Sequence, residues 1–223
     1  MNRTDLAEAV AIVGRMLDAL LAAPGDRTTE AAAGLRTACG DLRASVEAKL
    51  RAAELGTAML ACFDFARLAG ATPAGMAAVR AGIERETPAG LAGVAVAQAG
   101  VRCSLIQEAR ILAATTFASR DDVEAAQVRV NAGFDPAIDY AADAHDGAAY
   151  QALVALHAAV IRDLAERGRR LPRRVSYTFA TARPALALAN RIYGDASRAG
   201  ELMAENRVPH PLFMPRSGWA LSA

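Results

Sequence analysis

The C-terminal stretch RRVSYTFATARPALALANRIYGDASRAGELMAENRVPHPLFMPRSGWALSA, residues 173–223, decides the fold because it combines a change of periodicity with distinctive motifs. Its segment VSYTF, residues 175–179, alternates apolar and polar side chains with the two-residue period of a half-buried strand. Trp219 and Leu221 stand two positions apart at the other end and predict a closing strand. We therefore expect the two ends of this stretch to pair.

Two short helices are predicted between these strands. Pro184 favours a helix start and Gly194 favours a helix stop. Ser197 is the predicted N-cap of the second helix, which runs over residues 198–206 and buries Leu202. The resulting order of strand, helix, helix and strand resembles the lysin-motif (LysM) fold.

A more specific resemblance lies in the run YGDASRAGELMAENRVPHPLFMP, residues 193–215. It is similar to the C-terminal region of the DNA circularisation proteins of Mu-like tailed phages and prophages. The shared features are a Tyr-Gly-Asp turn at 193–195, an Asn-Arg pair at 206–207 and a His-Pro-x-Phe loop at 210–213, and the upstream run 163–175 is similar as well. Proteins of that family are regarded as tail and baseplate components.

The resemblance implies a structural subunit of a phage or prophage-derived tail, at the baseplate or its hub. Such a protein is made in the host cytoplasm and ends in the virion. Its partners would be other tail or baseplate proteins and copies of itself. The family's name also invites a second function, the binding of DNA ends, which stays open as an alternative.

The LysM likeness raises the alternative of peptidoglycan binding during infection. In glycan-binding LysM domains the sugar lies between the loop after the first strand and the loop before the last, here residues 180–183 and 208–217. The first loop lacks the usual Gly-Asp-Thr-type polar residues. In the second, residues 209–215 are apolar and stiffened by three prolines, so little entropy is lost when they dock into a protein surface. Docking is therefore favoured, and the predicted interface residues are Tyr193, Asn206, His210, Phe213, Met214 and Trp219.

Upstream of this module, apolar residues recur at helical spacing, so the chain is predicted to be mainly α. We expect an α-helical domain over residues 1–166, an arginine-rich junction over 167–174 and a βααβ LysM-like module over 175–223. The predicted helices are one that ends before Pro24, one over 26–70 broken at Gly40, two that start at the Thr-Pro pairs 72–73 and 87–88, one from Ser119 to Gly133, one from Asp135, and one over 148–166. The helix from residue 87 is the candidate for the centre of the domain.

The composition of the 223 residues bounds the function further. An apolar content of 53% is enough for a hydrophobic core. A formal charge of +1 excludes a global field that would attract nucleic acid or anionic lipid. The three cysteines, Cys39, Cys62 and Cys103, are odd in number and widely spaced, which predicts buried thiols in place of a disulfide framework. The longest apolar run without charge, residues 87–101, is too short to span a membrane.

One cluster resembles a metal or acid–base site: Asp139, Asp143, His145 and Asp146. No second histidine stands at ligand spacing, so a solvated helix end is favoured. His157 lies on an apolar stripe and is expected to be a half-buried structural histidine. Motifs for hydrolases, metalloproteases and phosphate-binding loops are missing from the sequence. We therefore expect no enzyme activity, catalytic residue, cofactor or metal.

A dense basic patch precedes the module and consists of Arg167, Arg169, Arg170, Arg173 and Arg174. Arginines bind phosphate through bidentate hydrogen bonds. Here Asp163 and Glu166 dilute the charge, and stacking partners for bases are missing except for Tyr177 nearby. A solvated hinge or a salt-bridging subunit contact is therefore favoured over a nucleic-acid site.

Overall fold

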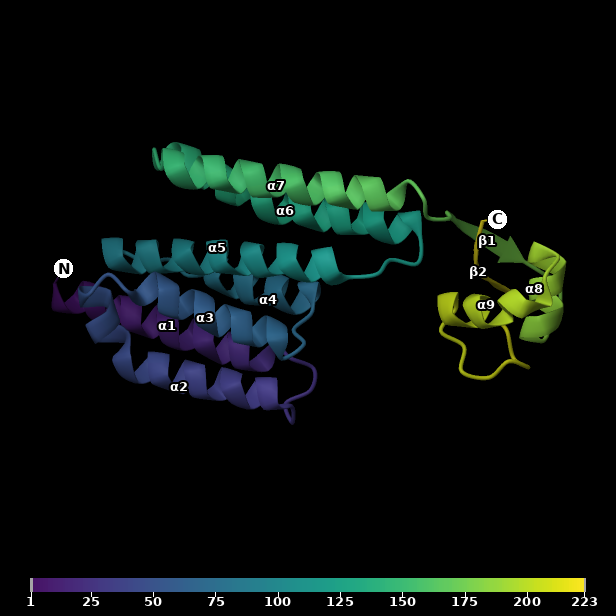
Figure 1. Ribbon diagram of the computed structural model, residues 1–223, viewed down its shortest axis with the longest axis horizontal. Helices are drawn as coiled ribbons and strands as arrows, with labels where there is room; N and C mark the ends of the chain where they lie inside the picture. Colours follow the sequence, from purple (N-terminus) through teal and green to yellow (C-terminus); the bar gives the residue numbers. More distant parts are fainter. Residues whose placement is uncertain (1, 223) are drawn as a thin grey trace. The chain divides into compact units, whose positions relative to one another are not determined.

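The computed structural model describes residues 2–222, which are mainly α-helical and end in a small two-stranded antiparallel sheet (Figure 1). None of the helices in this part of the chain has the length and apolar character needed to cross a membrane. The elements are α1 Arg3–Ala22, α2 Glu30–Arg51, α3 Leu55–Leu68, α4 Pro73–Glu84, α5 Leu91–Ala114, α6 Arg120–Asp143, α7 Gly147–Gly168, β1 Arg174–Thr178, α8 Ala185–Tyr193, η1 Ala196–Arg198, α9 Ala199–Glu205 and β2 Ser217–Leu221.

The chain divides into two compact units. The first contains the residues up to Thr115 together with Asn131–Val160, and the second contains Thr116–Val130 together with the residues from Ile161 onward. Both α6 and α7 begin in one unit and end in the other. The predicted boundaries, 1–166, 167–174 and 175–223, stay a prediction.

The first unit is a helical bundle built around α5. This helix packs against α1, α3 and α4, and α2 packs against α1 and α3. α5 is buried on most of its sides, as expected for the helix predicted to lie at the centre. The largest fully buried side chains of the unit include Ile12, Leu17, Leu35, Phe63, Met76, Leu105 and Phe134.

All three cysteines are buried free thiols of this bundle, as the sequence predicted. Cys39, Cys62 and Cys103 lie on α2, α3 and α5. Burial raises the pKa of the Cys103 thiol to about 11. Since only the thiolate is an effective nucleophile, Cys103 is inert at neutral pH.

The break between α2 and α3 corrects one prediction. The chain was expected to break at Gly40, but Gly40 lies inside α2. The helix ends instead at the turn through Ala53, whose φ of 58° is left-handed. A glycine in a helix costs only about 1 kcal/mol, so packing along the rest of α2 overrides it.

The start of α5 corrects a second prediction. The pair Thr72–Pro73 caps α4 as expected, because the Thr72 hydroxyl accepts a hydrogen bond from the Gly75 N–H at 3.0 Å. The similar pair at 87–88 does not begin a helix, and α5 starts at Leu91, three residues after Pro88. Two side chains of α1 bind the backbone at this start. The Glu8 carboxylate accepts hydrogen bonds from the Ala89 and Gly90 N–H groups, which precede α5, at 2.9 and 2.8 Å, and Asp5 accepts one from the Ala92 N–H in its first turn at 3.0 Å.

We expect Glu8→Ala to speed amide hydrogen exchange at Ala89 and Gly90, because these N–H groups lose their acceptor. The same two hydrogen bonds lower the pKa of Glu8 in the folded protein. A carboxyl group whose pKa is lower in the folded protein than in the unfolded chain stabilises the fold at pH values above its pKa in the unfolded chain. This stabilisation is lost as the pH falls through its pKa in the folded protein. The protection in the wild type should therefore fade in acid. Glu54→Ala, an exposed carboxylate at a helix start without a side-chain cap bond, is the control and should leave both amides unchanged.

The third correction concerns α6. Two helices were predicted, one ending at Gly133 and one starting at Asp135, but α6 runs unbroken through Pro136. Proline removes one backbone hydrogen bond, and here the buried side chains of Phe134 and Ala137 on either side hold the helix in the bundle. The predicted cap is confirmed, since the Ser119 hydroxyl accepts a bond from the Asp122 N–H at 3.2 Å.

The C-terminal segment has the predicted order of strand, helix, helix and strand. β1 pairs antiparallel with β2, with Arg174 opposite Leu221 and Tyr177 opposite Gly218. Gly194 ends α8 with a left-handed φ of 72°, a conformation that glycine adopts without strain. The side chains of this small core are Tyr177, Ala185, Leu188, Ala189, Ala199, Leu202, Met214 and Ala220.

Two local predictions in this segment are wrong. Ser197 was expected to cap the second helix, but it lies inside the 3-10 helix η1, where its N–H donates to Asp195 at 2.8 Å. α9 then begins at Ala199. In β1 only Tyr177 is buried, and Val175 is 51% exposed although it was predicted to lie on the apolar side of the strand.

Candidate protein-interaction site

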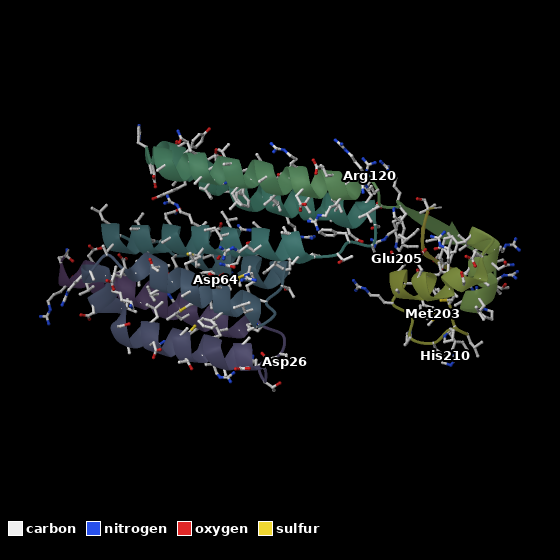
Figure 2. The ribbon with its side chains drawn as sticks, in the orientation of Figure 1. Asp26, Asp64, Arg120, Met203, Glu205 and His210 are labelled. Atoms are coloured by element: carbon white, nitrogen blue, oxygen red, sulfur yellow. The ribbon has the colours of Figure 1, made fainter. Side chains whose placement is uncertain are left out.

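The predicted docking segment forms a fixed loop between α9 and β2, which we call the proline loop (residues 207–216). Figure 2 labels His210 in this loop. Its backbone is tied to the module at both ends: Val208 N–H donates to Met203 O at 3.0 Å, and Arg216 O accepts from Phe179 N–H at 2.7 Å. In the middle, Pro211 O accepts from the Ala185 N–H at the start of α8 at 2.6 Å. The loop therefore presents its outer side chains on a rigid base.

Three side chains form the exposed tip of this loop, which we call the apolar tip: His210, Leu212 and Phe213. Phe213 is 72% exposed, and its ring centroid lies 5.1 Å from that of His210. His210 also stabilises a turn of the backbone. Its carbonyl oxygen accepts a hydrogen bond from the Phe213 N–H, and its Nδ1 accepts one from the Leu212 N–H. Contiguous exposed apolar groups are typical of a surface that binds another protein.

Met214 was predicted to be an interface anchor, and the structure corrects this. Its side chain is only 1% exposed and belongs to the core of the module with Leu188 and Leu202. The loop thus inserts Met214 inward and turns Phe213 outward. Met214 stabilises the base of the loop instead of contacting a partner.

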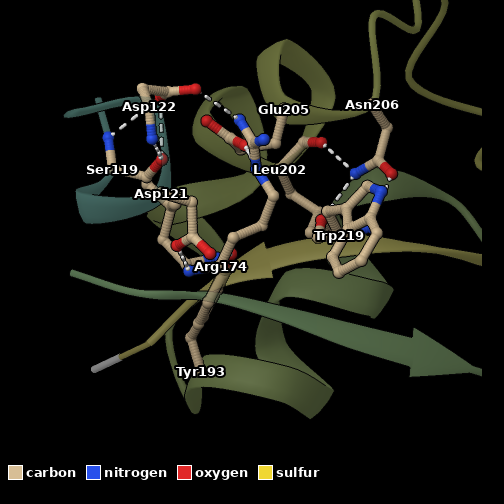
Figure 3. A network of polar contacts seen from close by, with 10 residues as sticks. Ser119, Asp121, Asp122, Arg174, Tyr193, Leu202, Glu205, Asn206 and Trp219 are labelled. Atoms are coloured by element: carbon tan, nitrogen blue, oxygen red, sulfur yellow. Dashed lines mark hydrogen bonds and ion pairs between the residues drawn. The ribbon is translucent and has the colours of Figure 1, made fainter. Parts of the chain in front are cut away.

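Asn206 is a structural clamp. Its Nδ2 donates to Leu202 O and to Trp219 O, both at 2.7 Å, and its Oδ1 accepts from Trp219 N–H at 2.8 Å (Figure 3). Gly218 permits this arrangement, because a Cβ there would lie 2.1 Å from the Asn206 Oδ1. The clamp joins the end of α9 to the backbone of β2 and leaves the Trp219 side chain 49% exposed.

Tyr193 also has an internal role. Its hydroxyl oxygen accepts a hydrogen bond from the Leu221 N–H at 3.1 Å, and the Arg198 guanidinium lies 3.9 Å from the centre of its ring. Burial raises the pKa of the Tyr193 hydroxyl. Of the six predicted interface residues, His210, Phe213 and Trp219 are on the surface, while Tyr193, Asn206 and Met214 hold the module together.

Two exposed apolar residues were not among the six named interface residues. Leu212 lies within the predicted docking segment 209–215 and is exposed beside Phe213. Leu186 on α8 was not predicted as a surface residue, and it is 61% exposed. It follows Ala185, whose backbone binds the proline loop, so it lies beside the loop's attachment point.

The arginine-rich junction is fixed by ion pairs. Arg174 donates from Nε to Glu205 at 2.9 Å and from Nη2 to Asp122 at 3.2 Å, and its backbone N–H donates to Asp121 at 2.7 Å (Figure 3). These contacts join β1 to the first turn of α6 and to the end of α9. A further backbone bond runs from Arg120 N–H to Pro172 O at 2.8 Å.

Of the other arginines of the predicted patch, Arg167 lies in the last turn of α7, and the rest lie in the segment between α7 and β1. Arg167 pairs with Asp163 at 2.6 Å and stacks over the Phe117 ring at 5.2 Å. Arg169, Arg170 and Arg173 are exposed. Asp163 and Glu166 line the same surface hollow as Arg167, Arg169 and Arg170, so acidic groups stand among the basic ones.

Neither protein-family models nor curated proteins give a match for this chain.

The acidic cluster around His145 lies at the end of α6 and in the connection to α7, with Asp139 and Asp143 in α6 and His145 and Asp146 in the connection. Asp146 accepts a hydrogen bond from the Ala149 N–H at 3.1 Å and pairs with Arg102 at 2.9 Å, and these contacts lower its pKa. Across residues 2–222, no group of three or more His, Cys, Asp or Glu side chains is arranged to hold a metal ion. His157 is half-buried as expected, with its ring stacked on Phe134 at 5.1 Å and Nε2 2.8 Å from the Asn131 Oδ1.

Proposed function

We propose that this chain is a structural subunit of a phage or prophage-derived tail, at the baseplate or its hub, and that the apolar tip docks into a neighbouring subunit. The observation that carries the proposal is that two adjacent side chains of the proline loop, Phe213 and Met214, point in opposite directions. Met214 fixes the loop from inside, while Phe213 is 72% exposed next to Leu212. A preformed loop loses little entropy on binding, and exposed aromatic groups dominate interface energies.

We also propose that the C-terminal segment is a LysM-like module. Its order of strand, helix, helix and strand and the antiparallel pairing of β1 with β2 support this. The alternative function of such a module, peptidoglycan binding, would use loops 180–183 and 208–217. The apolar tip occupies the second of these loops and offers few polar groups for a sugar.

Binding of DNA ends is the remaining alternative. It would need the arginines of the junction to face phosphate groups. Arg174 and Arg167 are instead occupied with Asp122, Glu205 and Asp163. Arg169, Arg170 and Arg173 are exposed, and the first two share a surface hollow with Asp163 and Glu166. This favours a structural role for the junction.

Phe213→Ala is the test of the docking role. Loss of a central aromatic anchor costs at least about 2 kcal/mol of binding, roughly 30-fold in affinity, so incorporation into purified particles or tail-like assemblies should fall sharply. The fold should be unaffected, because a 72% exposed side chain contributes little to the core. Incorporation is measured by quantitative immunoblotting of gradient-purified particles.

Val128→Ala is the matched control, since Val128 is also an exposed large apolar residue, 68% exposed on α6. It should be incorporated normally. Wild-type incorporation of Phe213→Ala would refute the docking role. Absence of the wild-type chain from mature particles would refute the structural function, and binding to peptidoglycan and to linear DNA would then be compared.

A further inference from the structure

We propose that the partner of the apolar tip is a second copy of this chain, and that the tip enters a groove of the first unit between α4, α5 and α6. This inference rests on the proposed function and specifies its partner. Each copy would offer its proline loop to one neighbour and its groove to another.

The groove is a hollow of about 450 Å³ on the surface of the first unit. This volume falls in the range of about 300–1,000 Å³ typical of ligand pockets, and it suits an aromatic and an aliphatic side chain. The residues that line it are mostly apolar, with a few polar groups among them: Ile83, Glu84, Glu86, Pro88, Val94, Ala97, Gln98, Val101, Pro136, Ala137 and Tyr140.

Charge complementarity selects a second copy as the occupant. The first unit has 12 basic and 16 acidic residues, a net charge of −4, and the second has 13 basic and 8 acidic residues, a net charge of +5. The nearly neutral chain therefore consists of an acidic part and a basic part. Complementary fields of this kind steer association and suppress wrong partners.

The same complementarity holds locally. The proline loop carries Arg207 and Arg216 around its apolar middle and contains no acidic residue. On the groove side, Glu84 and Glu86 are already paired with Arg80 and Arg15. The excess negative charge near the groove comes from the part of α6 that supplies one wall, because residues 131–143 include three aspartates and no lysine or arginine. These aspartates, Asp135, Asp139 and Asp143, are exposed and recur at every fourth position.

A contact between a loop and a groove is heterologous, since the two surfaces differ. Heterologous contacts between identical chains generate closed rings when the rotation closes, and filaments when it does not. Such a contact is suited to a subunit of a symmetric tail.

Sedimentation velocity of the full chain over a concentration series tests this inference. The wild type should self-associate, more strongly at low salt than at high salt. Phe213→Ala removes the loop anchor, and Val94→Arg places a cation on the groove lining, so each should weaken self-association by at least about 30-fold. A mixture of the two variants should form a one-to-one dimer, because one variant keeps its groove and the other keeps its loop.

Charge reversal adds an independent measurement. The double variant Arg207→Glu/Arg216→Glu should not self-associate, and it should bind the double variant Asp139→Lys/Asp143→Lys. Arg27→Glu/Glu54→Lys reverses two exposed charges of opposite sign away from the groove, leaves the net charge of the first unit at −4, and should associate like the wild type. Circular dichroism verifies that each variant is folded.

A wild type that stays monomeric up to about 1 mM, or a mixture of Phe213→Ala and Val94→Arg without dimer, would overturn the inference. Presence of such a monomeric chain in purified particles would leave the proposed function standing. Conversely, self-association through the groove by a chain that is absent from particles would refute the tail function alone.

Discussion

Arg80→Ala is expected to lower the free energy of unfolding by about 3–5 kcal/mol, the usual effect of breaking a buried ion pair. The Arg80 guanidinium donates to Glu108 at 3.1 Å, and the two side chains are only 10% and 7% exposed. A second bond runs from Arg80 to Glu84 at 2.9 Å. Without the guanidinium, Glu108 would remain charged and desolvated inside the bundle.

The loss should depend on pH. Burial raises the pKa of Glu108 in the folded protein above its ordinary value, and removal of Arg80 would raise it further. A carboxyl group whose pKa is higher in the folded protein than in the unfolded chain destabilises the fold as the pH rises. The loss of stability develops between its pKa in the unfolded chain and its pKa in the folded protein. Arg80→Ala should therefore be most harmful at neutral pH and least harmful below the unfolded pKa of about 4.3.

Urea unfolding followed by far-ultraviolet circular dichroism measures this effect. Glu84→Ala is the control, because Glu84 is 38% exposed and its pair with Arg80 spans one helical turn, so its loss should stay under about 1 kcal/mol. The double variant Arg80→Met/Glu108→Leu should recover most of the stability, since apolar residues replace both charges. An unchanged midpoint for Arg80→Ala would show that Glu108 is solvated.

Asn206→Ala is expected to destabilise the C-terminal module by about 3 kcal/mol. The amide makes three hydrogen bonds, to Leu202 O, Trp219 O and Trp219 N–H. Each contributes about 1 kcal/mol net. The module has a small core and no disulfide among its described residues, so this loss is large relative to its stability.

The fluorescence of Trp219 reports this change directly, because it is the only tryptophan in the sequence. The variant should show its Trp219 transition at a lower urea concentration than the wild type. Asn190→Ala, which removes the same amide from an exposed position on α8, should unfold like the wild type. Equal midpoints for the two variants would contradict the clamp role of Asn206.

The elements that the sequence predicted correctly are those with local causes. Gly194 ends α8 through its own φ, Thr72 caps α4 through its own hydroxyl, and the period of 175–179 indicated a strand. Two of the errors arose where distant residues decide. α5 starts late because α1 supplies Glu8, and α6 passes Pro136 because the buried residues around it hold the helix.

The sequence also predicted the location of the candidate site, but not which of its side chains point outward. Composition pointed to the proline loop, but it could not separate Phe213 from Met214, which are adjacent and both apolar. Their opposite orientations follow from backbone bonds made by Pro211 and Arg216 to Ala185 and Phe179. In the same way, the clamp role of Asn206 depends on Trp219, 13 positions away, and no local pattern reveals it.

The attachment of Arg174 to Asp122 has an evolutionary consequence. When recombination exchanges a segment of a gene, the encoded segment stays folded only if the residues that hold it in place are exchanged with it. The two residues of this ion pair lie 52 positions apart. A crossover between them, for example at residue 170, would transfer the strands and Glu205 without Asp121 and Asp122, two of the three carboxylates that bind Arg174. A segment that is exchanged with its fold intact would therefore have to begin upstream of the first turn of α6. Crossovers that preserve the fold are expected before Thr116.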